Sequence, residues 1–141
     1  MFFYIEPEVA GGIGPNSVLH REIGRPITVS KLHYVFDGWL GDALLETTPC
    51  FIVTDKARRM IETEKLSGVG FGDVEVSRSG EFDDLHPTLE LPHFWWMKVN
   101  SASFDEDFGL TSDLRLAVSE RAMATLRAAG IVHALVEPAN R

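Results

Sequence analysis

The sequence has one cysteine, no long hydrophobic run and few basic side chains, and each shortage excludes a class of protein. Cys50 alone cannot form an internal disulfide, which is typical of a reducing compartment. No apolar stretch reaches the roughly 18 residues of a membrane-spanning helix, and the chain opens without the basic region of a signal peptide. We therefore expect a cytoplasmic protein. Thirteen Lys and Arg against 21 Asp and Glu give a net charge of −8, which argues against nucleic acid or a membrane as partner.

The remaining composition predicts a single folded domain over residues 1–141. Apolar residues make up 45% of the chain and charged residues 24%, which is the profile of an ordinary globular domain. A chain of this length buries roughly two-thirds of the surface that it exposes when unfolded. We therefore expect a core that needs no cofactor and no structural metal.

One segment follows a strand–helix–strand plan. Residues 50–53 form a short apolar run, and Thr54 after it is a good N-cap. Apolar positions then recur with helical spacing, which predicts a helix over residues 55–66. A strand over residues 69–76 is expected to complete the unit.

A second segment repeats this plan. A strand is expected over residues 114–118, with Ser119 as the N-cap of a helix over residues 120–129. Gly130 ends that helix, and residues 131–136 form the returning strand. The sequence thus predicts two β-α-β units. They are similar either through an old duplication or because any such unit uses these caps.

The rest of the chain favours strands and turns. Residues 2–6 form an opening strand, and residues 11–14 are glycine-rich and predict an irregular loop. Residues 27–36 are strand-like, but their alternation changes phase, which indicates a bulge or break near residues 30–31. We predict an α+β fold with a mixed, largely antiparallel sheet of about six or seven strands and two helices. The expected core comprises Cys50, Phe51, Val53, Met60, Ile61, Leu114, Leu116, Met123, Leu126 and Val136.

The acidic segment, residues 71–113, is the least ordinary part of the sequence. It holds ten acidic and two basic side chains, which accounts for the whole net charge of the chain. Within it, residues 91–99 are apolar at both odd and even positions. That pattern fits a strand buried on both sides, or a strand with one aromatic face free for binding, in which case Trp96 is the exposed member.

No motif of the sequence carries a complete catalytic or metal-binding pattern. Residues 11–14 lack the lysine of a phosphate loop, and residues 107–109 spell the metal-binding tripeptide of kinases in a chain too short for that fold. His86 and His93 lie near acids, but their spacing is not that of a zinc site. Cys50 begins an apolar run, where a cysteine is usually a small core residue. We expect no enzyme activity and no bound metal.

Four segments resemble a family of small bacterial proteins that is associated with the immunity proteins of polymorphic toxin systems. They are residues 4–11, residues 36–42, residues 91–92 before the aromatic run, and residues 114–119. The resemblance extends over nearly the whole chain and implies a cytoplasmic protein that captures a toxin domain. It names no toxin contact.

The charge pattern supplies the candidate site. Toxin domains that cleave nucleic acid are basic, and an acidic, aromatic-rich surface would attract and anchor such a partner. We therefore expect a protein partner, with self-association possible. The alternative is a small enzyme or ligand binder with a pocket between sheet and helices. The predicted partner-binding residues are Asp83, Asp84, Trp96, Asp105, Glu106 and Asp107.

Overall fold

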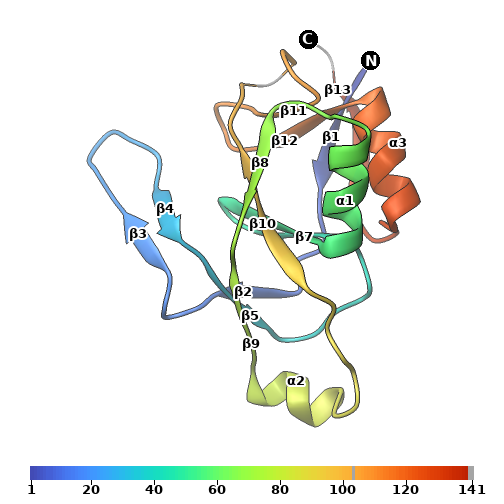
Figure 1. Ribbon diagram of the computed structural model, residues 1–141. Helices are drawn as coiled ribbons and strands as arrows, with labels where there is room; N and C mark the ends of the chain where they lie inside the picture. The colour runs from blue at the N-terminus through green and yellow to red at the C-terminus, as the bar shows by residue number, and fades with distance from the viewer. Residues whose placement is uncertain (103, 140–141) are drawn as a thin grey trace.

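The computed structural model describes residues 1–102 and 104–139 (Figure 1). These residues form thirteen strands and three helices, which confirms the α+β class. The single sheet of six or seven strands was wrong, because the strands divide among four sheets. The third helix, α2 (Gly80–Leu85), lies in the acidic segment and was not predicted.

The first sheet contains both ends of the described chain. Its order is β11 (Phe108–Leu110), β12 (Leu116–Ser119), β1 (Phe2–Glu6) and β13 (Leu135–Ala139). All neighbours are antiparallel. The opening strand has the predicted bounds.

The second sheet lies at the centre of the molecule. Its order is β6 (Leu44–Thr47), β7 (Cys50–Thr54), β10 (Phe94–Val99) and β8 (Val69–Gly72), again all antiparallel. Each face of this sheet is covered by other elements, which explains why β7 and β10 are apolar at successive positions.

The two predicted helices begin where their caps indicate. At the starts of α1 (Asp55–Thr63) and α3 (Glu120–Ala129), the side chains of Thr54 and Ser119 each accept a hydrogen bond from the backbone N–H of the residue three positions further along the chain. Gly130 ends α3 with φ of 111°, a left-handed conformation that glycine adopts without strain. The two helices pack side by side (Figure 1).

Both β-α-β units are present, but their strands do not pair directly. In each unit a third, antiparallel strand lies between the two: β10 between β7 and β8, and β1 between β12 and β13. The predicted strand bounds need correction. The strand over residues 69–76 is interrupted after Gly72, and the strand expected from residue 114 begins at Leu116, because Leu114 has φ of 66°. The returning strand expected over residues 131–136 begins only at Leu135.

A third sheet joins parts of the chain far apart in sequence. Its order is β2 (Gly11–Ile13), β5 (His33–Phe36) and β9 (Glu75–Arg78), and β5 and β9 are parallel. The loop predicted over residues 11–14 is therefore partly a strand. Glycine is needed there, because a Cβ on Gly11 would overlap the carbonyl oxygen of Val35.

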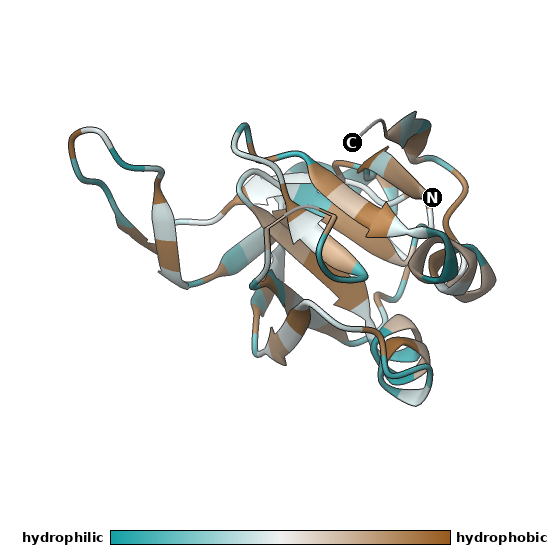
Figure 2. Ribbon diagram, turned by 90° about the horizontal axis from the view of Figure 1, so that it is seen from above, coloured by the Kyte–Doolittle hydropathy of each residue, from teal (hydrophilic) through white to brown (hydrophobic). Residues whose placement is uncertain are grey.

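A two-stranded hairpin projects from the body of the molecule (Figures 1 and 2). It consists of β3 (Val18–His20) and β4 (Thr28–Lys31), which pair with each other. The break predicted near residues 30–31 is confirmed at Leu32, between β4 and β5.

Two hydrophobic clusters lie on opposite faces of the second sheet. One fills the space among this sheet, the first sheet and helices α1 and α3; the other lies between the second and third sheets and includes Phe82 of α2. Of the predicted core residues, Met60, Leu114 and Val136 are half-buried and the others are buried. No described helix is long and apolar enough to cross a membrane.

Candidate protein-docking surface

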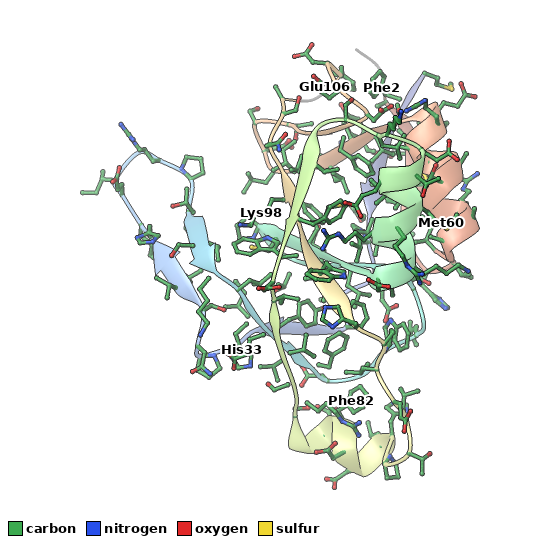
Figure 3. All side chains as sticks on the ribbon, viewed as in Figure 1. Phe2, His33, Met60, Phe82, Lys98 and Glu106 are labelled. Atoms are coloured by element: carbon green, nitrogen blue, oxygen red, sulfur yellow. The ribbon has the colours of Figure 1, made fainter. Side chains whose placement is uncertain are left out.

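The six predicted partner-binding residues do not form one surface. Asp83 and Asp84 lie on α2, next to the labelled Phe82 in Figure 3, whereas Asp105 and Glu106 lie at the opposite end of the molecule. The acidic segment passes through the core as β10 between these two ends. The single docking face predicted from the sequence is therefore corrected to two separate acidic groups.

Of the two alternatives for residues 91–99, the structure favours a strand buried on both sides, so Trp96 is not the exposed aromatic residue of a binding face. Its side chain is 7% exposed and belongs to the cluster between the second and third sheets, with Lys98 Nζ 4.4 Å from its ring centroid. Trp95, on the other face of β10, is more accessible and donates a hydrogen bond to Asp55 (2.9 Å). Arg58 lies over the Trp95 ring at 4.1 Å.

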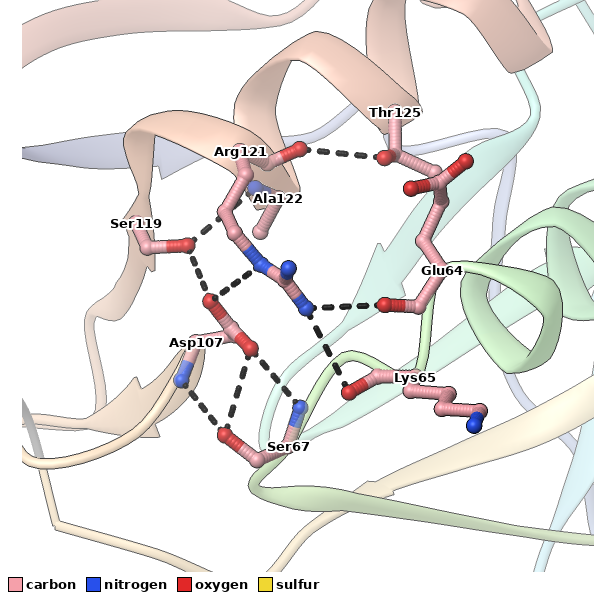
Figure 4. A network of polar contacts seen from close by, with 8 residues as sticks. All are labelled: Glu64, Lys65, Ser67, Asp107, Ser119, Arg121, Ala122 and Thr125. Atoms are coloured by element: carbon pink, nitrogen blue, oxygen red, sulfur yellow. Dashed lines mark hydrogen bonds and ion pairs between the residues drawn. The ribbon is translucent and has the colours of Figure 1, made fainter.

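Asp107 is engaged in holding the fold together (Figure 4). Its carboxylate accepts hydrogen bonds from the Ser119 hydroxyl (2.6 Å) and from the Ser67 backbone N–H (2.9 Å), and Arg121 lies 3.5 Å away. Burial of this side chain, which is 14% exposed, opposes its charge. The hydrogen bonds and the guanidinium outweigh burial, so the pKa of Asp107 lies below its usual range. A carboxylate with these partners has little capacity left for docking.

Asp83 is also paired within the chain. Arg78 Nε lies 2.8 Å from its carboxylate, and the same guanidinium donates to the carbonyl oxygens of Leu89 and His86. Arg78 thus fixes α2 and the loop after it. Among the residues that the structure describes, Glu81 and Asp84 on α2 form no ion pair.

Three exposed aliphatic side chains lie around one concavity next to α2. Val9, Leu40 and Leu85 are 68%, 67% and 64% exposed, and all three line a hollow of about 420 Å³. They come from three segments that are distant in sequence. We call this the Leu85 surface, and it comprises Val9, Asp37, Trp39, Leu40 and Leu85. Glu81 and Asp84 belong to the same helix as Leu85 and lie outside the lining of the hollow.

The Leu85 surface carries negative charge. Asp37 lines the hollow and is exposed, and Glu81 lies one helical turn before Leu85 on the same face of α2. Asp84 is the preceding residue of that helix. Among the described residues that line the hollow there is no Lys or Arg. The surface therefore combines apolar anchoring points with an acidic rim.

Buried carboxylates hold the loops of this surface in place. Glu8 accepts hydrogen bonds from the backbone N–H groups of Leu40 (2.7 Å) and Asp42 (3.2 Å). Asp42 in turn accepts from the N–H groups of Val132 (2.9 Å) and His133 (2.8 Å). The loop that carries Leu40 is thus preorganised, which lowers the entropic cost of binding.

Sequence reasoning missed Val9, Leu40 and Leu85, the apolar part of this surface. Val9, Leu40 and Leu85 come from three different short segments, and single exposed aliphatic residues are common on protein surfaces. Only their convergence on one hollow distinguishes them. The one available signal was the acidic residues on both sides of Phe82.

A polar cluster around His33 gives no support to the enzyme alternative. His33 Nε2 lies 2.7 Å from Ser77 Oγ and 3.6 Å from Glu75 Oε2. Its Nδ1 accepts a hydrogen bond from the Asn16 N–H (3.2 Å), so the neutral ring carries its proton on Nε2. In this tautomer His33 donates toward Ser77 and cannot remove its proton, which a nucleophilic serine requires.

Cys50 and the histidines are also poorly arranged for chemistry. Burial raises the pKa of the Cys50 thiol to about 11, so the thiolate is scarce at neutral pH. Within residues 1–102 and 104–139, no group of three His, Cys, Asp or Glu side chains could hold a metal ion. The pair His86 and His93 therefore lacks the further ligands that a site would need.

Comparisons with known proteins leave the resemblance to immunity proteins as a prediction. No family model matches the sequence, and no curated protein matches it.

Proposed function

We propose that the protein is a cytoplasmic binding protein of the immunity type, which captures a basic protein partner such as a toxin domain on the Leu85 surface. The observation that carries this proposal is the convergence of Val9, Leu40 and Leu85 on one hollow whose charged rim is acidic. Exposed apolar patches with polar rims are typical of protein interaction sites.

Each part of the surface has a separate role in this proposal. The acidic rim attracts a basic partner over a distance and raises the association rate, an effect that salt weakens. The aliphatic side chains then exclude water from an apolar side chain of the partner and slow its dissociation. The fixed loops keep the hollow open before the partner arrives.

The experiment begins with the protein as bait in its host, followed by identification and purification of the retained partner. Binding kinetics are then measured for Leu85→Asp and for the triple variant Asp37→Asn, Glu81→Gln and Asp84→Asn. Leu85→Asp should weaken binding and raise Kd by about 30-fold or more, because it places a charge in the apolar contact. The triple variant should slow association and flatten its salt dependence.

The matched control is Asp105→Asn with Glu106→Gln, two exposed acids at the opposite end of the molecule. This control should leave the kinetics nearly unchanged. Loss of fast association in the control, with unchanged kinetics in the triple variant, would instead place docking at that end. Protection of growth when the partner is co-expressed tests the immunity role itself.

A ligand-binding function is the second candidate, because an apolar groove of suitable size lies beside the central sheet. The groove has a volume of about 410 Å³ and lies between β4 and the ends of β7 and β10. It is not the pocket between sheet and helices that was expected. Binding of a fluorescent fatty acid, with Lys98→Ala as the test variant, would favour this function.

A further inference from the structure

The turn of the projecting hairpin presents an apolar side chain to solvent. Ile23 lies between β3 and β4 and is fully exposed. The hairpin pairs only within itself among the described strands, and it extends away from the body (Figure 2). A fully exposed isoleucine on such an arm costs solvation free energy that contact with a partner would recover.

The residues around Ile23 carry positive charge. Arg21 and Arg25 lie two positions before and after it, and both are exposed. Glu22 is the one acid of this turn and forms an exposed ion pair with Arg25 (3.4 Å). Pairs of this kind contribute little, so they can rearrange on binding. The turn therefore presents an aliphatic side chain between two guanidinium groups.

This chemistry is complementary to the Leu85 surface. That surface offers three aliphatic side chains for Ile23. Asp37 in its lining, with Glu81 and Asp84 on the adjoining helix α2, supplies carboxylates for the two arginines. We propose that the hairpin turn of one copy docks on the Leu85 surface of a second copy. This inference rests on the proposed function for the location of the surface, but it needs no other protein.

Two consequences follow from the geometry. The contact joins two different surfaces, so copies either exchange arms reciprocally in a dimer or assemble head to tail. The contact is also small compared with a stable interface, and we expect reversible association at high protein concentration. A basic partner and a second copy would compete for the same surface, so self-association would protect the exposed apolar residues until the partner arrives.

Sedimentation velocity of the whole purified protein tests the inference. The average mass should rise with protein concentration and fall when salt is added, because salt screens the arginine–carboxylate attraction. Ile23→Asp and Leu85→Asp should each remain monomeric. Both positions are exposed, so neither change removes core packing, and circular dichroism checks the fold.

Mixing the two variants gives the sharpest result. Ile23→Asp retains an intact Leu85 surface, and Leu85→Asp retains an intact arm, so an equal mixture should associate again. Leu135→Asp, on β13, is the matched control, since it also charges an exposed leucine and should associate like the unmodified protein.

Three results would overturn the inference: a monomer at every concentration and salt, association that survives in both single variants, or a mixture that stays monomeric. A monomeric unmodified protein whose purified partner still loses affinity with Leu85→Asp would leave the proposed function standing. Self-association of the unmodified protein, together with unchanged affinity of Leu85→Asp for the purified partner, would support the inference and contradict the proposed function.

Discussion

The Glu8 carboxylate accepts a 2.7 Å hydrogen bond from the backbone N–H of Leu40, which lies 32 positions further along the chain. Its other oxygen accepts from the Asp42 N–H. Glu8 is buried, and its two hydrogen bonds fix the position of the loop that carries the exposed Leu40.

Glu8→Ala should destabilise the fold by about 1–3 kcal/mol, because it removes the acceptor of two backbone N–H groups and leaves them without partners. Chemical denaturation measures the loss. Glu90→Ala, which removes an exposed acid, should change the free energy of unfolding by less than about 0.5 kcal/mol. Equal effects of the two changes would mean that the Glu8 hydrogen bonds contribute nothing.

Asp107→Asn should also destabilise the protein at neutral pH, by about 1–3 kcal/mol, because charge-assisted hydrogen bonds become neutral ones. The folded pKa of Asp107 is lowered, so its contribution is present above the unfolded pKa of about 3.9 and is lost as pH falls through the folded value. The difference between the two proteins should therefore shrink below about pH 4. Glu106→Gln, at the exposed neighbour, is the control and should change the free energy of unfolding at neutral pH by less than about 0.5 kcal/mol.

Tyr34 should titrate at strongly alkaline pH. Burial raises its pKa to about 12, so its contribution to stability is complete below the unfolded value of about 10 and is lost as pH rises through the folded value. Ultraviolet difference spectroscopy follows its ionisation. The chain has two tyrosines, so subtracting the curve of Tyr34→Phe isolates the Tyr34 signal. A Tyr34 transition near pH 10 in folded protein would contradict the prediction.

Cys50 should react slowly with a thiol-directed disulfide reagent in the folded protein. The side chain is buried and its pKa is raised to about 11, so both access and thiolate concentration are low near neutral pH. Addition of denaturant should release the full, fast reaction of one thiol. Fast reaction without denaturant would show that the groove beside β7 opens to the reagent.

Leu126→Ala should cost about 2–5 kcal/mol, since Leu126 is fully buried in α3 and its removal leaves a cavity. Leu135→Ala is the matched control on the surface and should cost much less. A loss near zero for Leu126→Ala in chemical denaturation would mean that the apolar face of α3 does not support the core.

Elements whose signals are local could be predicted from the amino-acid sequence alone. The caps Thr54 and Ser119, the helix stop at Gly130 and the aromatic and β-branched run of residues 2–6 each act over a few neighbouring residues, and the structure confirms all four. The β-α-β plan follows from them.

Features that depend on contacts between distant residues could be recognised only in the folded chain. The insertion of β10 between β7 and β8 buried Trp96. The folding of the chain also brought both Ser67 and Ser119 within hydrogen-bond distance of Asp107, which made it a structural residue. Likewise Val9, Leu40 and Leu85 form one surface only after three segments converge. Strand order and burial depend on contacts between residues far apart in sequence, and periodicity within a short window does not contain that information.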